Sequence, residues 1–213
     1  MRILFAAGGT GGHLYPAIAI AEEILKIAPG SKATFVGTKA KIEARVVPQK
    51  GYEFHTIWIS GFSRRLSVSN ILFPVKVIVS LFQSFFVIKK IRPDVVVGTG
   101  GYICGPILFL ASKLGIPTVI HESNSYPGLT TRLLASRVTK VLITFAASKK
   151  WMSPAADVEL VGNPTREELS KVTRRDGCEF FNLDPKKKIL LVFGGSLGAA
   201  SINRAMPPVV NDA

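Results

Sequence analysis

Cysteine is scarce in this sequence, which has only Cys104 and Cys178 among its 213 residues. The two lie far apart and show no spacing typical of a metal or redox site. This scarcity argues against a disulfide-stapled fold and a cysteine metal cluster. Both cysteines are expected to be reduced thiols, as is usual in cytosolic proteins.

Acidic residues are also few, with 14 Asp and Glu against 27 Lys and Arg and a formal net charge of +13. The positive excess favours anionic partners, which include nucleic acid, an acidic membrane surface and a phosphorylated substrate. The sequence lacks both an aromatic and basic stacking platform and a recognition-helix motif. We therefore expect no nucleic-acid partner.

Long uncharged apolar runs are missing as well. The most apolar segment, residues 71–92, is interrupted by Pro74 and Lys76, whereas a membrane span needs about twenty nearly uncharged residues. The apolar run at residues 2–7 is short and leads directly into glycines, unlike a signal peptide. We expect a cytoplasmic protein without a membrane span.

The sequence is rich in short apolar runs that alternate with helical patterns, first at residues 2–7, 17–27 and 33–36. With 47% apolar and 19% charged residues, the composition is that of a globular domain. The β-α-β order predicts a Rossmann-like α/β fold, with a parallel sheet and helices on both faces. Further strands are expected at residues 52–59, 94–97, 117–120, 138–145 and 159–161.

A glycine-rich turn, residues 8–13 (GGTGGH), follows the first predicted strand, and Pro16 suits the first turn of the next helix. Unpaired backbone N–H groups and the positive end of a helix dipole make such a turn a site for phosphate or another anion. The spacing matches neither the dinucleotide fingerprint nor the P-loop. A tight connection that binds no ligand therefore stays an alternative.

Two further polar turns follow predicted strands: residues 98–106 (GTGGYICGP) and residues 121–124 (HESN). The carboxyl ends of parallel strands share one edge, where open α/β sheets bind ligands. Two glycine turns on this edge favour an anion cleft more strongly than either does alone. His121 belongs either to this site or to its buried support, and His55 is expected to be structural.

Residues 71–92 predict a helix with more apolar surface than one packing stripe requires. Packing against the sheet accounts for one face. Because cations flank the apolar residues, we also expect contact with an anionic bilayer. The expected contact residues are Arg64, Arg65, Phe73, Lys76, Phe82, Phe85, Phe86 and Lys89.

The pattern of strand, glycine turn and helix recurs near the end of the sequence, at residues 189–193, 194–198 and 199–206. This repeat predicts a second domain of the first one's kind. Fewer than thirty residues follow Lys186, whereas a doubly wound domain needs on the order of 100. We expect a first domain over residues 1–163, followed over residues 164–213 by a linker and the first β-α unit of an incomplete second domain.

Five motifs occur together in one order: GGTGGHLYPAIAIA, GTGGYICGP, HESN followed by PGLT, GNPTR and GGSLGA. With them the chain resembles the MurG family of bacterial glycosyltransferases over nearly its whole length. The resemblance implies a GT-B fold of two Rossmann-like domains and requires no metal or other cofactor. It also implies transfer of N-acetylglucosamine from UDP-N-acetylglucosamine to lipid I (undecaprenyl-pyrophosphoryl-N-acetylmuramyl-pentapeptide). The product would be lipid II for peptidoglycan, made by a peripheral protein on the cytoplasmic face of the bacterial inner membrane.

The resemblance also assigns roles to residues. It implies that the first domain takes the lipid acceptor, with His13 and Glu122 as catalytic candidates and Tyr102 in the acceptor cleft. The other implied contacts are Thr10, Gly11, Gly12 and Asn124 with the donor sugar, Arg166 with the UDP portion, and Ser196 with a diphosphate oxygen. Such a transfer needs a base near the attacking hydroxyl, and an imidazole, which exchanges protons near neutral pH, suits that task.

Two departures and two alternatives qualify this interpretation. Ser123 stands where the family usually has Gln, and the shorter side chain is expected to reach its partner through water. The segment that would hold uracil is absent, so we expect this chain alone to be inactive. A related UDP-sugar-dependent glycolipid glycosyltransferase stays open because fold and loops do not fix the sugars. A non-enzymatic membrane-binding module stays open too.

Overall fold

The computed structural model describes residues 1–61, 71–167, 171–194 and 199–211. The chain divides into two units, Met1–Thr165 and Arg166–Ala213. In the first unit the elements are β1 (Arg2–Ala6), α1 (Gly11–Ile27), β2 (Lys32–Gly37), α2 (Glu43–Gln49), β3 (Glu53–Thr56), α4 (Phe73–Ile91), β4 (Val95–Gly98), α5 (Cys104–Lys113), β5 (Thr118–Glu122), α6 (Leu129–Leu134), β6 (Lys140–Ile143), the 3₁₀ helix η1 (Ala146–Trp151) and β7 (Val158–Leu160). The second unit contains α8 (Arg174–Phe180) and α9 (Ala200–Asn211).

The first unit is built on a seven-stranded parallel sheet with the order β3-β2-β1-β4-β5-β6-β7. Phe5 in β1 is in register with Phe35 of β2 on one side and Val97 of β4 on the other. After β3 the chain crosses to the far side of β1 and continues outward from β4. The winding therefore reverses between β1 and β4, and open α/β sheets bind ligands at such a switch point. The predicted Rossmann-like fold is confirmed.

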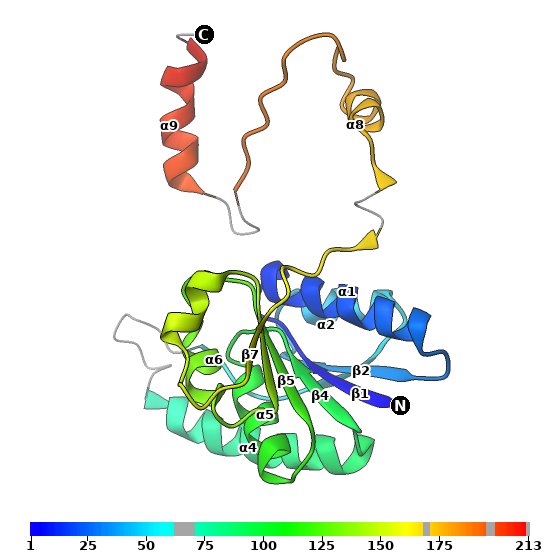
Figure 1. Ribbon diagram of the computed structural model, residues 1–213, viewed down its shortest axis with the longest axis vertical. Helices are drawn as coiled ribbons and strands as arrows, with labels where there is room; N and C mark the ends of the chain where they lie inside the picture. The colour runs from blue at the N-terminus through cyan, green and yellow to red at the C-terminus, as the bar shows by residue number, and fades with distance from the viewer. Residues whose placement is uncertain (62–70, 168–170, 195–198, 212–213) are drawn as a thin grey trace. The chain divides into compact units, whose positions relative to one another are not determined.

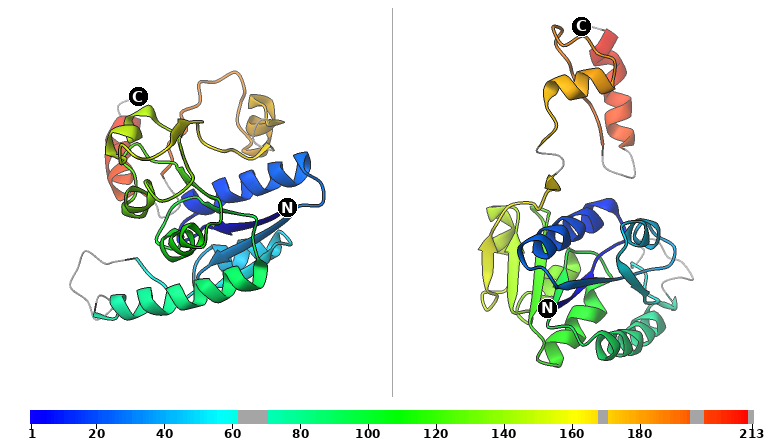
Figure 2. Two further views of the ribbon diagram at one scale, coloured as in Figure 1. Left: turned by 60° about the horizontal axis from the view of Figure 1, so that its bottom comes forward. Right: turned by 90° about the vertical axis from the view of Figure 1, so that its right-hand side faces the viewer.

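Helices cover both faces of this sheet, with α1 and α2 on one face and α4 and α5 on the other (Figures 1 and 2). Alternate residues of β1 supply the two cores, because side chains along a strand point to opposite faces. Ile3 and Phe5 pack with Leu14 and Ile18 of α1. Leu4 and Ala6 belong to the other core, which holds the inward faces of α4, α5 and α6.

The start of α1 differs from the prediction. Pro16 was expected in the first helical turn, but the helix begins at Gly11, and Pro16 lies in its second turn. The helix extends back through the glycines because Thr10 has extended backbone and its carbonyl accepts from the N–H of His13 at 3.2 Å. The Thr99 hydroxyl also donates to the His13 carbonyl at 2.6 Å. His13 is therefore fixed on a helix rather than carried by a loop.

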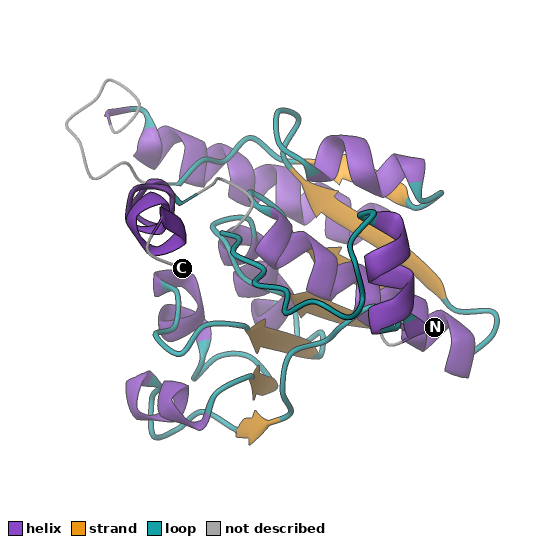
Figure 3. Cartoon of the chain, turned by 90° about the horizontal axis from the view of Figure 1, so that it is seen from above, coloured by secondary structure: helices purple, strands orange, loops and turns teal. Residues whose placement is uncertain are grey.

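The second unit corrects another expectation. The buried strand predicted at residues 189–193 is wrong, because these residues form a loop between α8 and α9 (Figures 1 and 3). Leu190 is 74% exposed and Phe193 is 75% exposed. A parallel strand is buried only between neighbouring strands, and the described part of this unit contains no strand that could pair with it. The helix expected after the glycine turn is present as α9.

Candidate anion site at the switch point

Three connections meet at one edge of the sheet. They follow β1, β4 and β5, which are adjacent in the sheet, and lead into α1, α5 and α6. The structure thus places the two glycine turns and the HESN segment side by side at the carboxyl ends of neighbouring strands. The first two flank the switch point.

The two glycine turns touch one another through backbone atoms. A Cβ added to Gly101 would lie 2.9 Å from the carbonyl oxygen of Gly8. A Cβ added to Gly100, whose φ is +101°, would lie 2.7 Å from Nδ1 of His13. The second turn needs glycine at both positions, because its backbone lies directly against the His13 ring and the first turn.

His13 is half-buried between these turns. Its Nδ1 atom is buried and has no hydrogen-bond partner among the described residues. The main chain of His13 is held by Thr10 and Thr99, as described above. A single imidazole is therefore fixed where α1 begins, next to the backbone of the second turn.

The N-termini of α1 and α5 are suited to a bound anion. Neither helix has an acidic residue in its first turn, and the Thr10 side chain makes no capping hydrogen bond in α1. At α6 the chain supplies its own anion, because Oε2 of Glu122 accepts from the N–H of Gly128 at 3.0 Å. The positive ends of α1 and α5 therefore favour an external negative group.

Cys104 anchors the second turn to the sheet. Its single S–H is shared between the carbonyl oxygens of Ala6 and Gly100, which lie 3.1 and 3.0 Å from Sγ. Complete burial raises the pKa of this thiol to about 12. A thiol that stays protonated is no nucleophile, so Cys104 has a structural role.

Glu43 positions the first turn and was missed by sequence reasoning. It is fully buried, and its carboxylate accepts from the N–H of Gly9 at 3.0 Å and from the N–H and hydroxyl of Thr38 at 3.0 and 2.8 Å. A Cβ on Gly8 would lie 2.4 Å from Cδ of Glu43. The only sequence signal was a glutamate shortly after a predicted strand, which is too common to single out.

Glu122 is buried at the end of β5 and uses both carboxylate oxygens within the fold. Oε1 accepts from the main-chain N–H of Asn124 at 3.0 Å and from its side-chain Nδ2 at 2.7 Å, while Oε2 binds Gly128. These bonds hold the loop that carries Asn124, and Asn124 itself is exposed. The contacts favour a positioning role for Glu122 over proton transfer.

His121, which the sequence left open between the site and its buried support, is also fully buried. Its Nε2 lies 3.0 Å from the Gly162 carbonyl oxygen, which makes this nitrogen the donor, and its Nδ1 lies 3.4 Å from the Ser123 hydroxyl. Burial is the main cause that lowers the pKa of His121. Of the two readings left open for His121, the structure favours buried support. His55 likewise has a local partner, Glu53, at 2.9 Å.

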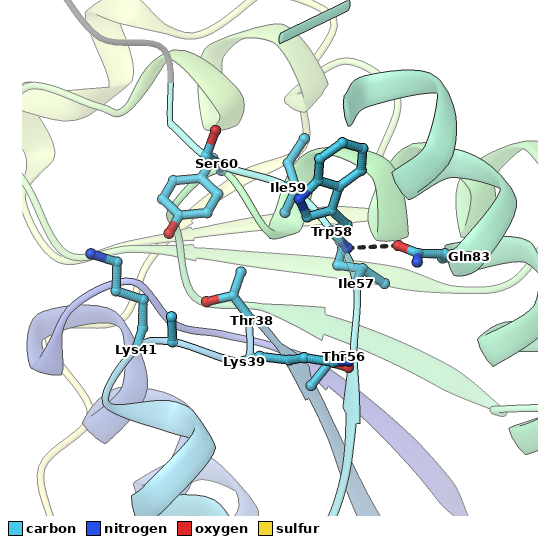
Figure 4. Close-up of a pocket in the computed structure, with 11 residues that line it drawn as sticks. Thr38, Lys39, Lys41, Thr56, Ile57, Trp58, Ile59, Ser60 and Gln83 are labelled. Carbon is cyan, nitrogen blue, oxygen red and sulfur yellow. Dashed lines mark hydrogen bonds between the residues drawn. The ribbon is translucent and has the colours of Figure 1, made fainter. Parts of the chain in front are cut away.

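Tyr102 extends the second glycine turn toward two cavities. Burial, with a smaller contribution from the negative charge of Glu43, raises the pKa of its hydroxyl. One cavity, of about 440 Å³, lies between Tyr102, residues 38–41 and residues 56–60. Figure 4 shows Trp58 on one side of this cavity, its main-chain N–H bonded to Oε1 of Gln83 at 2.6 Å, with Lys41 on the other side.

The residues predicted to contact a membrane differ in how exposed they are in the structure. Phe82 and Phe86 are 64% and 67% exposed on α4, and Lys89 near the helix end is exposed too. Phe73 and Phe85 are half-buried. Lys76 donates to the Ser60 hydroxyl at 3.0 Å and lies 5.8 Å from the centre of the Trp58 ring, so it is turned away from the exposed phenylalanines.

The other predicted site residues lie elsewhere. Arg166 is a half-buried residue of the second unit, whereas Arg64, Arg65 and Ser196 lie outside the described residues. Within the described ranges, no helix has the length and apolarity to cross a membrane. The same ranges contain no cluster of three or more His, Cys, Asp or Glu side chains that could hold a metal ion.

The fold defines a Rossmann-like domain of the kind found in GT-B glycosyltransferases, with the candidate anion site at the switch point. Residues 3–143 match the glycosyltransferase family 28 N-terminal domain, and the chain belongs to this family.

The most informative relatives are UDP-N-acetylglucosamine--N-acetylmuramyl-(pentapeptide) pyrophosphoryl-undecaprenol N-acetylglucosamine transferases. The chain is 45% identical to the one from Thermoanaerobacter sp. (strain X514) over 206 residues, which cover 97% of the chain and 57% of the relative. It is 46% identical to the one from Christiangramia forsetii, over 96% of the chain and 56% of the relative. The chain thus spans little more than half the length of these curated relatives.

A solved structure shows the same family similarity. The crystal structure of MurG from Acinetobacter baumannii matches with a TM-score of 0.63 and 28% identity, covering 80% of this chain and 47% of that one. The similarity to the MurG family inferred from the five motifs is confirmed.

Proposed function

We propose that this chain is the acceptor-binding part of a transferase that moves N-acetylglucosamine from UDP-N-acetylglucosamine to lipid I, forming lipid II. The proposal rests on the N-termini of α1 and α5 at the switch point, which have no acidic residue in their first turns, and on His13 in the first turn of α1. A pyrophosphate suits this place, because helix N-termini and glycine-turn N–H groups bind phosphate oxygens. The relatives named above act on a pyrophosphoryl-undecaprenol, which carries such a group.

In the proposed reaction the 4-hydroxyl of the muramyl sugar attacks C1 of N-acetylglucosamine. His13 accepts the hydroxyl proton as the new C–O bond forms, and UDP leaves with the electrons of the old bond. Thr10, Gly11, Gly12 and Asn124 are proposed to face the donor sugar, and Tyr102 the acceptor. Glu122 is proposed to position Asn124 rather than to transfer a proton.

Residues 164–213 are proposed to belong to the nucleotide-sugar domain. There Arg166 would contact the UDP portion and Ser196 a diphosphate oxygen. The family match, which covers residues 3–143 and ends before this segment, and the relatives, of which the chain spans 57%, are consistent with this proposal. It assigns the incoming sugar nucleotide mainly to the second domain and the lipid acceptor to the first.

The decisive measurement is transfer of labelled N-acetylglucosamine by the complete enzyme with His13→Asn, using UDP-N-acetylglucosamine and lipid I. We expect kcat to fall by about 10²- to 10⁴-fold, the range for loss of a general base. The matched control is His55→Asn, because His55 contacts Glu53 away from the site. Unchanged kcat in His13→Asn would refute the role of His13. A screen of other sugar donors and acceptors would expose a related glycolipid specificity.

We also propose that α4 rests on the anionic cytoplasmic face of the bacterial inner membrane. The buried positions of this helix include two polar side chains, Ser80 and Ser84, beside the apolar Ile88. Large apolar side chains are exposed at Val75, Ile78, Phe82 and Phe86, and at Leu72 just before the helix. Lys89 and Lys90 follow at the end of the helix. An exposed apolar stripe next to cations fits a negatively charged bilayer.

Sedimentation with phosphatidylglycerol vesicles tests this contact. Replacing Phe82 and Phe86 by Ser should weaken vesicle binding by at least about tenfold, since burying one such side chain contributes about 1.5–3 kcal/mol. Ile27→Ser, at a 70% exposed position at the end of α1, should leave binding unchanged. Equal binding by the wild type and the double variant would rule out this surface.

A further inference from the structure

A second cavity, of about 560 Å³, lies between α4, α5 and α6. Its wall is mainly aliphatic and aromatic and includes Val77 and Leu81 from α4, Pro106 and Phe109 from α5, and Leu133 from α6. Leu129 and Leu133 are 63% and 64% exposed along it. The volume is in the range of pockets that hold small organic ligands. We call this cavity the α4–α6 groove.

One end of the groove adjoins the anion site. Tyr102 and Gly105, which line it, belong to the second glycine turn and to the first turn of α5. A Cβ added to Gly105 would find its nearest neighbour, Cγ2 of Thr130, at 3.8 Å. The absence of a side chain at Gly105 thus leaves space between the two helices beside the anion-binding helix end.

The groove also adjoins the exposed stripe of α4. Phe73, Val77 and Leu81 face the groove, whereas their sequence neighbours Leu72, Ile78 and Phe82 are exposed on the outer stripe. An apolar chain that starts at the anion site can follow the groove and emerge beside the surface assigned to the bilayer. The groove therefore joins a site for a charged group to an apolar surface.

We propose that the α4–α6 groove binds the first isoprene units of a polyprenyl pyrophosphate, with the pyrophosphate at the N-termini of α1 and α5. This inference rests on the proposed function and deepens it, because it makes the lipid part of the acceptor a recognised element rather than only a membrane anchor. The pyrophosphate supplies the charge that the helix ends favour. The isoprene units supply the apolar surface that the groove would remove from water.

Calorimetric titration of the chain with three soluble probes tests the groove: inorganic pyrophosphate, farnesyl diphosphate at monomeric concentrations, and farnesol. We expect farnesyl diphosphate to bind at least about tenfold more tightly than pyrophosphate, equivalent to about 1.4 kcal/mol. Leu133→Asp, which places a charge in the groove at an exposed position, should remove most of this gain without affecting pyrophosphate binding. Ile27→Asp, an exposed site outside the groove, is the matched control.

The outcomes separate the groove from the anion site. Equal affinity for pyrophosphate and farnesyl diphosphate would overturn the groove and leave the anion site standing. An equal effect of Leu133→Asp and Ile27→Asp would also overturn it, because binding would then be unspecific. Farnesol binding that is lost in Leu133→Asp would support the groove even if pyrophosphate failed to bind, which would count against the proposed function alone. Binding of none of the probes would overturn both.

Discussion

Glu43 shows how single residues shape a site without facing it. Its buried carboxylate binds the main chain of Gly9 and Thr38, so it fixes the glycine turn from behind. Sequence reasoning and the family resemblance proposed residues with recognisable chemistry, such as His13 and Asn124. They missed Glu43, because only the fold reveals that this carboxylate is buried, and they left open whether His121 was buried support.

Gly100→Ala should disturb His13 in addition to straining the backbone. At φ +101° the strain alone costs about 1–3 kcal/mol, and the new Cβ would lie 2.7 Å from the His13 ring. Gly115→Ala is the control, because Gly115 has φ +72° with no atom within 4 Å of the added Cβ. Urea unfolding should show the larger loss for Gly100→Ala, and only this variant should lose pyrophosphate binding. Equal losses would contradict the packing of His13 on Gly100.

His121 predicts a pH dependence of stability. Burial lowers its pKa in the folded state, so between that lowered pKa and about 6.5, the value of an unfolded histidine, the unfolded chain binds more protons. Its contribution to stability is therefore present above about pH 6.5 and is lost as the pH falls. Between pH 7.5 and pH 5.5 the urea midpoint should fall more for the wild type than for His121→Gln, whose side chain does not titrate. Parallel drops would contradict a buried neutral His121.

At the scale of elements, predictions succeeded where a local pattern and the fold agree. Strands that lead into a glycine turn, such as β1 and β4, were predicted because a buried apolar run before a tight turn is typical of a parallel strand. The start of α1 was misjudged, because glycines favour turns locally and the support from Thr99 comes from a distant segment. The strand expected at residues 189–193 failed because a buried strand depends on neighbours that the pattern cannot supply.

The packing of α4 gives a prediction at this scale. The Ser84 hydroxyl is buried without a hydrogen-bond partner among the described residues, and an unsatisfied hydroxyl costs about 1–3 kcal/mol. Ser84→Ala should therefore stabilise the chain by roughly 1 kcal/mol. Ser80→Ala is the matched control, because the Ser80 hydroxyl donates to the Val77 carbonyl at 2.8 Å and its loss should cost about 0.5–1.5 kcal/mol. Chemical unfolding measures both, and destabilisation by Ser84→Ala would contradict the assignment.

At the scale of the whole molecule, the apolar cores belong to one unit. All seven strands of the sheet and both core clusters lie within Met1–Thr165. Beyond it, the described part of the second unit leaves apolar side chains such as Leu190 and Phe193 exposed. The first unit thus contains what a stable fold requires, whereas the described part of the second leaves most of its large apolar side chains exposed and buries Cys178.

We therefore predict that residues 1–165 fold alone with the urea midpoint of the whole chain. Tryptophan fluorescence is a suitable probe, because the two tryptophans of the sequence, Trp58 and Trp151, both lie in the first unit. Removing residues 166–213 should also reduce aggregation, since it removes exposed apolar side chains. A markedly lower midpoint for the shorter chain would show that the second unit contributes to the stability of the first.

The carboxylate of Glu122 at the start of α6 has a consequence beyond its own loop. Of the three helix ends along this edge, that of α6 has a carboxylate on its cap N–H, whereas the first turns of α1 and α5 contain no acidic residue and the Glu43 carboxylate lies behind α1, on Gly9. We therefore expect an uneven potential over this edge, which orients an approaching ligand whose charge lies at one end. We expect such a ligand to be oriented before it makes contact, with its charged head toward α1 and α5 and its tail pointing away from them.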